Sequence, residues 1–146
     1  NMKCLIQRVS EASVDVDSVC VGSIGRGLLV FVGVEPTDTA ASLTRMAERL
    51  LGYRVFADAD GRMNLSVADV KGDLLLVSQF TLAADTRKGT RPGFQTAAPP
   101  KLAASLFEQF VNGVKQRHKP VATGQFGANM QVSLVNDGPV TFLLEV

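Results

Sequence analysis

The sequence predicts an α+β fold, with mostly antiparallel, barrel-like β-structure and two helices in a single domain. Three observations lead to this prediction. The chain has 146 residues, a length typical of one domain. Short apolar runs separated by turn residues recur along it, enough for about seven or eight strands. Only two segments carry apolar residues at helical spacing. We assign residues 2–146 to this domain and interpret Asn1, which precedes Met2, as a remnant of expression or processing.

The first third is predicted to form three strands and a helix. The strands are expected over residues 3–16, with a bend, over 19–24 and over 28–34. The third is a nearly continuous apolar run, which is typical of a strand buried on both faces. The helix is expected to begin with Thr37 or Thr39 as N-cap and to end with Gly52 as C′ residue. Its apolar face comprises Leu43, Met46, Ala47, Leu50 and Leu51.

The middle third contains a strand that ends in polar residues. A short β-like stretch is expected at residues 53–56, followed by a polar loop at 58–62 with an Asp60-Gly61 turn. The next strand begins at Asp73, and its apolar run leads directly into Ser78-Gln79-Phe80-Thr81. Polar side chains at the end of a buried strand are a common place for a functional site.

The last third carries the second helix and a Gly-Pro pair between two strands. Pro99-Pro100 opens the helix, because proline is tolerated in a first turn. The helix has an apolar face formed by Ala103, Leu106, Phe107, Phe110 and Val114. A short strand at 121–123 precedes two final strands, which flank Gly138-Pro139. Proline cannot donate to a sheet ladder, so this pair must interrupt or edge the sheet. An ordinary turn and a functional backbone feature both remain open.

Composition limits the possible partners. The net charge is only +1, which argues against a protein held to nucleic acid by charge alone, so any RNA contact must be local. The two cysteines, Cys4 and Cys20, lack CxxC spacing and are predicted to be buried free thiols, as expected in a reducing cytoplasm. No apolar run is long enough to span a membrane. We therefore expect a cytoplasmic protein without a membrane partner.

The residues of hydrolytic sites are scarce. The single histidine, His118, lies at a charged helix end and is expected to be exposed, and no His/Cys/Asp/Glu spacing suits zinc. Neither a Walker nor a Rossmann phosphate loop is present, so no metal or cofactor is expected. Thr81 is a possible nucleophile without an evident base, and local hydrogen bonding is its alternative role. An enzyme of this composition would work mainly through backbone groups, hydroxyls and the substrate itself.

Four segments in order resemble the motifs of the D-aminoacyl-tRNA deacylases. They are Ile6-Gln7-Arg8-Val9, Ser78-Gln79-Phe80-Thr81-Leu82, Gly124 to Val132, and Asn136-Asp137-Gly138-Pro139-Val140-Thr141. The resemblance runs from Met2 to Val146. It implies a homodimer that hydrolyses the ester of a D-amino acid, or of glycine mischarged on tRNA-Ala, to tRNA. It also implies catalytic roles for the segment Ser78 to Thr81.

The resemblance further implies a chiral filter. Gly138-Pro139 would be cis and would reach into the active site of the other subunit, where its carbonyls exclude an L side chain. Arg8 would brace this pair, and Phe126, Ala128 and Met130 would line the substrate site. Because the ester is already activated, backbone N–H groups and the 2′-OH of the terminal ribose could provide the catalysis.

Two questions remain open at this point. The basic loop Arg87-Lys88-Gly89-Thr90-Arg91 is either a solvated surface or a contact for phosphates near the tRNA 3′ end. The alternative to an enzyme is a non-catalytic RNA- or small-molecule-binding α+β module. Release of an amino acid from D-Tyr-tRNA would distinguish the two.

Overall fold

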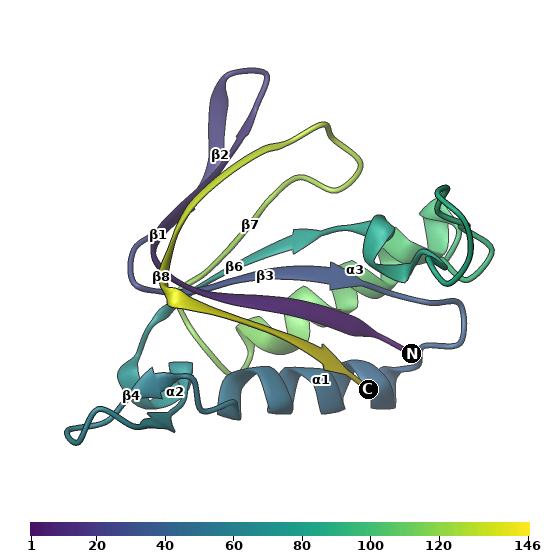
Figure 1. The fold of residues 1–146 in the computed structure, drawn as a ribbon. Coiled ribbons are helices and arrows are strands. Elements are labelled where there is room, and N and C mark those ends of the chain that lie inside the picture. The colour runs from purple at the N-terminus through teal and green to yellow at the C-terminus, as the bar shows by residue number, and fades with distance from the viewer.

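The fold is a curved six-stranded sheet with two long helices packed on one face (Figure 1), and a separate two-stranded sheet. The computed structural model describes all 146 residues. In chain order the elements are β1 (Lys3–Val16), β2 (Val19–Ile24), β3 (Gly27–Gly33), α1 (Ala40–Gly52), β4 (Phe56–Ala57), β5 (Met63–Leu65), α2 (Val67–Val70), β6 (Asp73–Ser78), the 3-10 helix η1 (Phe80–Ala83), α3 (Pro100–Lys115), β7 (Val121–Thr123) and β8 (Gln131–Glu145).

β1 organises the sheet because it pairs on both of its edges. Its first half pairs with β3 and its second half with β2, while β8 runs antiparallel along its other edge. β3, β6 and β7 continue the sheet as parallel neighbours. The sheet curves until β2 approaches β7, and a Cβ added at Gly22 would lie 2.5 Å from the Thr123 carbonyl oxygen. The predicted α+β, barrel-like class is confirmed, with parallel pairs beside the antiparallel ones.

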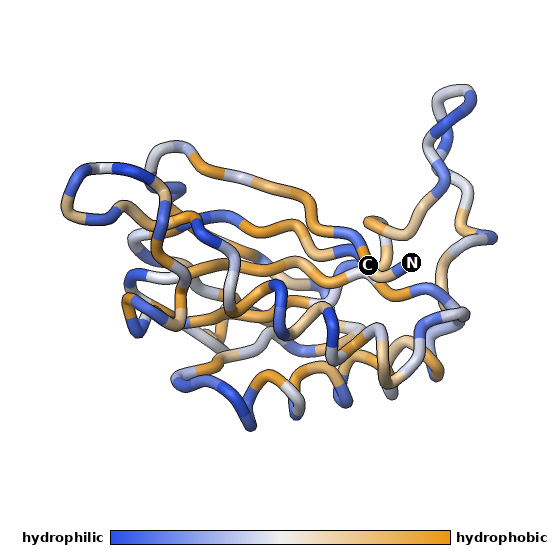
Figure 2. The backbone as a smooth tube through the Cα atoms, turned by 90° about the horizontal axis from the view of Figure 1, so that it is seen from below, coloured by the Kyte–Doolittle hydropathy of each residue, from blue (hydrophilic) through white to orange (hydrophobic).

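The central strands are buried on both faces, as their apolar runs predict. Leu28, Val30 and Val32 of β3 pack with α1 and α3 in the larger core cluster, together with Leu74 and Leu76 of β6. The alternate residues of these strands belong to a second cluster inside the curved sheet, which contains Leu29, Leu75 and Val77. Figure 2 shows apolar stretches running through the body of the molecule and hydrophilic ones at its loops.

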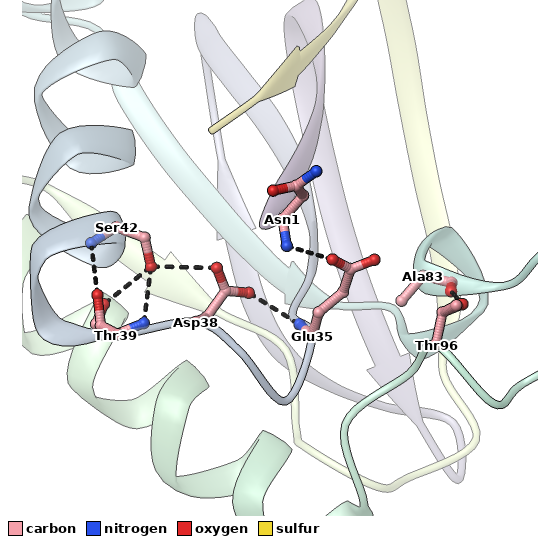
Figure 3. A network of polar contacts seen from close by, with 7 residues as sticks. All are labelled: Asn1, Glu35, Asp38, Thr39, Ser42, Ala83 and Thr96. Carbon is pink, nitrogen blue, oxygen red and sulfur yellow. Dashed lines mark hydrogen bonds and ion pairs between the residues drawn. The ribbon is translucent and has the colours of Figure 1, made fainter.

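The start of α1 is held by a network of polar contacts (Figure 3). Thr39 is the N-cap, and its side chain accepts from the Ser42 N–H. The Ser42 hydroxyl in turn contacts Asp38, whose other carboxylate oxygen accepts from the Glu35 N–H. The N-terminal amino group of Asn1 contacts the Glu35 carboxylate. The prediction of Thr39 as one of two possible N-caps and of the helix's apolar face is confirmed.

Several local predictions were wrong or incomplete. Gly52 is the last residue of α1, not its C′ residue, because the chain leaves the helix through Tyr53 in an extended conformation. The strand expected at 53–56 begins only at Phe56. Sequence reasoning missed β5 and α2, which are too short to show periodicity, although the capping box of Ser66 and Asp69 marks the start of α2.

Two side chains have environments other than those expected. Cys4 is buried as predicted, but Cys20 is exposed, because it lies on β2, where the sheet is not covered by helices. His118 is half-buried rather than solvated. Its Nε2 donates to the Gly72 carbonyl oxygen at 2.6 Å and so joins the end of α3 to the turn before β6. None of the helices combines the length and apolarity that a membrane crossing requires.

Candidate functional site

The largest cavity, of about 1000 Å³, opens where β3 and β6 end. Three segments form most of its walls: the end of β6 with η1, the segment leading into α3, and the loop after β7. The walls are mainly apolar. The lining residues are Phe31, Val77, Ser78, Gln79, Phe80, Thr81, Phe94, Ala97, Ala98, Pro99, Pro100, Ala103, Phe126, Gly127, Ala128, Met130 and Val132.

The parallel pairing of β3 and β6 positions the polar end of β6. Ser78 pairs with Val32, and the Gln79 N–H donates to the Val32 carbonyl at 2.8 Å, which extends the ladder by one residue. The chain then turns into η1 directly over Gly33. A Cβ at Gly33 would lie 2.8 Å from the Leu82 Cβ, so only glycine permits this close approach. The residues that follow Ser78 are thereby held in the cavity wall.

The polar groups of this wall are neutral. The Gln79 side-chain amide donates to the Thr81 hydroxyl oxygen at 2.8 Å, and an amide cannot serve as a general base. The N–H groups of Phe80 and Thr81 lie at the start of η1, where no acceptor exists within the helix. No cluster of three His, Cys, Asp or Glu side chains that could hold a metal forms in the structure. The wall therefore offers backbone donors, a hydroxyl and an amide to a ligand.

The opposite wall is the loop between β7 and β8. The ring of Phe126 lies 6.2 Å from that of Phe107 in α3, measured between centroids, which ties the loop to the helix. A Cβ at Gly124 would lie 2.7 Å from the Met130 sulfur, so the loop folds back tightly on itself. Phe126, Ala128 and Met130 all line the cavity. The structure thus brings together two of the sequence segments that were expected to form the site.

Gly138 and Pro139 lie elsewhere and do not line the cavity of their own chain. They are exposed, and the peptide bond between them is cis. The two final strands expected from the sequence form one strand, β8, which pairs with β1 on both sides of a bulge. Residues 137–140 oppose Arg8 alone, because Gln7 pairs with Thr141 and Val9 with Asn136. The pair therefore interrupts the ladder without turning the chain.

Side-chain hydrogen bonds fix this bulge from both ends. The Arg8 guanidinium donates through Nε to the Asp137 carbonyl at 2.9 Å and through Nη1 to the Val55 carbonyl at 2.7 Å. The Asn136 side chain accepts from the Val140 N–H at 2.6 Å and donates to the Thr141 hydroxyl at 2.9 Å. Sequence reasoning missed this role of Asn136, and an asparagine two residues before a Gly-Pro pair was its only local sign.

The bulge lies on a free sheet edge. β8 pairs with β1 alone, so its outer edge has no neighbour. Large apolar side chains are exposed on β8 and on β2: Val135, Phe142 and Leu143, and Val19 and Val21. Exposed apolar edge strands are typical places for pairing with another chain.

Several cavity residues had been interpreted only as core or as loop. Phe31 lies in the apolar run of β3, and nothing in that run distinguishes a cavity wall from a packed interior. Phe94 is 45 % exposed and packs against Phe80, which is 61 % exposed, with the ring planes tilted by 47° and their centroids 5.3 Å apart. A lone aromatic residue at the end of a polar loop was the one feature that could have indicated Phe94.

Comparison with known proteins identifies the family of the chain. The family model described as D-Tyr-tRNA(Tyr) deacylase matches residues 5–145. The chain is 66% identical over 144 residues to the D-aminoacyl-tRNA deacylase of Stenotrophomonas maltophilia, covering 98% of this chain and 99% of that protein. It is 60% identical over 144 residues to the protein of the same name from Teredinibacter turnerae, covering 99% of both.

Two solved structures share the fold. The c-Myc DNA Unwinding Element Binding Protein superposes with a TM-score of 0.95 at 39% identity, over 99% of this chain and 98% of that chain. A probable eukaryotic D-amino acid tRNA deacylase superposes with a TM-score of 0.84 at 17% identity, over 99% of both chains, and this likeness concerns the fold alone.

Proposed function

The chain belongs to the D-Tyr-tRNA(Tyr) deacylase family and is a D-aminoacyl-tRNA deacylase, and we propose that the ester is hydrolysed in the cavity at the end of β6. The observation that carries this proposal is the convergence of Ser78 to Thr81 with Phe126 to Met130 on one cavity. The cavity is large enough for an aminoacylated nucleoside, since small-molecule sites commonly measure 300–1,000 Å³.

Catalysis in this cavity relies on backbone groups and on the substrate. The N–H groups of Phe80 and Thr81 are suited to stabilise the oxyanion that forms when water attacks the ester carbonyl. One such donor contributes roughly 3–4 kcal/mol in known cases. Thr81 has a glutamine amide as its hydrogen-bond partner, and without a base its hydroxyl is a poor nucleophile. The 2′-OH of the terminal ribose supplies the remaining polar group next to the reacting ester.

Chiral selection depends on Gly138 and Pro139 of a second copy of the chain. The pair does not line its own cavity, yet it is exposed on a free strand edge beside apolar side chains. Arg8 and Asn136 hold it in one conformation. Inserted into the cavity of the second copy, its carbonyl groups would occupy the position of an L side chain. Glycine has no side chain to exclude, so glycyl-tRNA, including glycine mischarged on tRNA-Ala, is a substrate under this mechanism.

The test measures hydrolysis of D-Tyr-, L-Tyr- and glycyl-tRNA by monitoring the release of the free amino acid. We expect rapid release of D-Tyr and glycine and slow release of L-Tyr. A non-catalytic module would bind the tRNA without releasing any amino acid, which would refute the proposal for the cavity. Strong discrimination against glycine would instead refute exclusion by Gly138-Pro139, because a side-chain-free substrate has nothing to clash with the pair.

A further inference from the structure

A short loop projects from the molecule between η1 and the segment leading to α3, and its hydrophilic course is visible in Figure 2. The loop is closed at its base. Asp85 and Gly93 exchange two backbone hydrogen bonds, with N to O distances of 2.7 and 2.9 Å. Residues 86–92 between them are all exposed. The loop is therefore anchored at both ends and has a defined position.

The charges of this loop are of nearly one sign. Arg87, Lys88 and Arg91 are opposed by Asp85 alone, so the loop carries +2 while the whole chain carries +1. Asp85 forms a two-point ion pair with Arg87, with N to O distances of 2.9 Å each, and this guanidinium lowers the pKa of Asp85 to about 2. No ion pair engages Lys88 or Arg91. Together with Asp85, Gly93 and Gln95, these basic residues line a hollow of about 520 Å³ without an apolar side chain.

The basic loop lies at the rim of the proposed catalytic cavity. Phe94 follows the loop directly and packs against the Phe80 ring, and both rings line that cavity. Two residues further on, the Thr96 hydroxyl donates to the Ala83 carbonyl at 2.6 Å. These contacts join the segments before and after the loop. The cationic hollow is thus held beside the cavity mouth.

We propose that Lys88 and Arg91 bind phosphates of the single-stranded tRNA 3′ end, at the nucleotides that precede the terminal adenosine. The inference rests on the proposed function, because an ester that enters the cavity leaves the preceding nucleotides at its rim. Those nucleotides present one negative charge each, and the loop presents two free cations there. Arg87 is not included, since its guanidinium already pairs with Asp85 through Nε and Nη2. The chain is nearly neutral overall, so these two local cations provide its electrostatic attraction for RNA.

The double variant Lys88→Gln/Arg91→Gln tests the proposal, with Arg45→Gln/Lys115→Gln as a control that removes the same charge from exposed positions on α1 and α3. Hydrolysis is measured with D-Tyr-tRNA between low and moderate salt, and with D-tyrosyl-adenosine, which lacks the preceding phosphates. For the double variant we expect KM for D-Tyr-tRNA to rise on the order of tenfold at low salt. The slope of log(kcat/KM) against log salt is negative, and it should become shallower by about 1.4, or 0.7 for each lost phosphate contact.

The rate with D-tyrosyl-adenosine and the behaviour of the control should match the wild type. Equal KM and salt slope for the double variant and the control would overturn the proposal. An equal loss with D-tyrosyl-adenosine would overturn it too, because the loop would then shape the cavity rather than bind phosphates. If the wild type hydrolyses neither substrate, the proposed function fails. In that case the affinity for uncharged tRNA is measured by fluorescence anisotropy for the double variant and the control. Weaker binding by the double variant alone would support the phosphate contact, and equal binding would overturn it.

Discussion

Replacing Gly138 with alanine tests the proposed chiral filter most directly. The residue has φ of +143°, a conformation that side chains rarely adopt. An added Cβ would lie 2.7 Å from Val140 Cγ2 and 3.0 Å from the Val140 backbone nitrogen. The first contact can be relieved by a side-chain rotation. The second cannot, because the Val140 N–H is bonded to the Asn136 side chain at 2.6 Å. The substitution must therefore strain the bulge or displace it.

The magnitude follows from these two routes. A non-glycine residue in such a backbone conformation costs about 1–3 kcal/mol. If the bulge keeps its shape, the free energy of unfolding falls by about that amount, and the melting temperature falls by about 2–4 °C per kcal/mol for a chain of this size. If the bulge moves instead, the carbonyls of residues 138 and 139 leave their positions. Hydrolysis of L-Tyr-tRNA should then rise by roughly tenfold or more relative to D-Tyr-tRNA.

Gly61→Ala is the matched control. Gly61 has φ of +79° in the turn between β4 and β5, and an added Cβ there meets nothing within 4 Å. It should lose stability through its backbone conformation alone and keep the D/L rate ratio of the wild type. Urea denaturation and deacylation rates are measured for both variants. Wild-type stability together with a wild-type D/L ratio in Gly138→Ala would refute the strain argument. Destabilisation with an unchanged ratio is the outcome expected when the bulge keeps its shape, because the carbonyls of residues 138 and 139 then stay in their positions.

Three further predictions concern the reaction and the thiols. Thr81→Ala should keep most of the deacylation activity, because Thr81 has no base; a loss near 10⁴-fold with a trapped acyl-enzyme would make it the nucleophile. A tRNA ending in 2′-deoxyadenosine, charged on its 3′-oxygen, should bind normally but react far more slowly, and equal rates would point to an unrecognised protein base. Cys20 should react with iodoacetamide in the folded protein and Cys4 only in denaturant, because burial, followed by the charge of Asp38, raises the pKa of the Cys4 thiol; equal labelling rates in the folded state would contradict the burial of β1.

The sequence by itself determined the elements whose cause is local. The apolar face of α1 is set by residues three and four apart, and its start by Thr39 next to the helix it caps. The continuous apolar runs of β3 and β6 predicted strands buried on both faces, and both core clusters draw on them. Proline chemistry placed the start of α3 at Pro100 and required a break in the ladder at Pro139.

Only the tertiary structure decided which segments distant in sequence are in contact. The cavity depends on the pairing of Ser78 with Val32 and on the stacking of Phe126 against α3, contacts between segments that the chain order does not relate. The same is true of Cys20, whose apolar neighbours suggested burial but whose strand lacks a covering helix, and of His118, whose partner is the distant Gly72 carbonyl. Gly138 and Pro139 look like a turn in sequence, because turn residues report only a local break in pairing. Their place in a bulge opposite Arg8, away from their own cavity, follows from the register of β1 and β8 on both sides of that break.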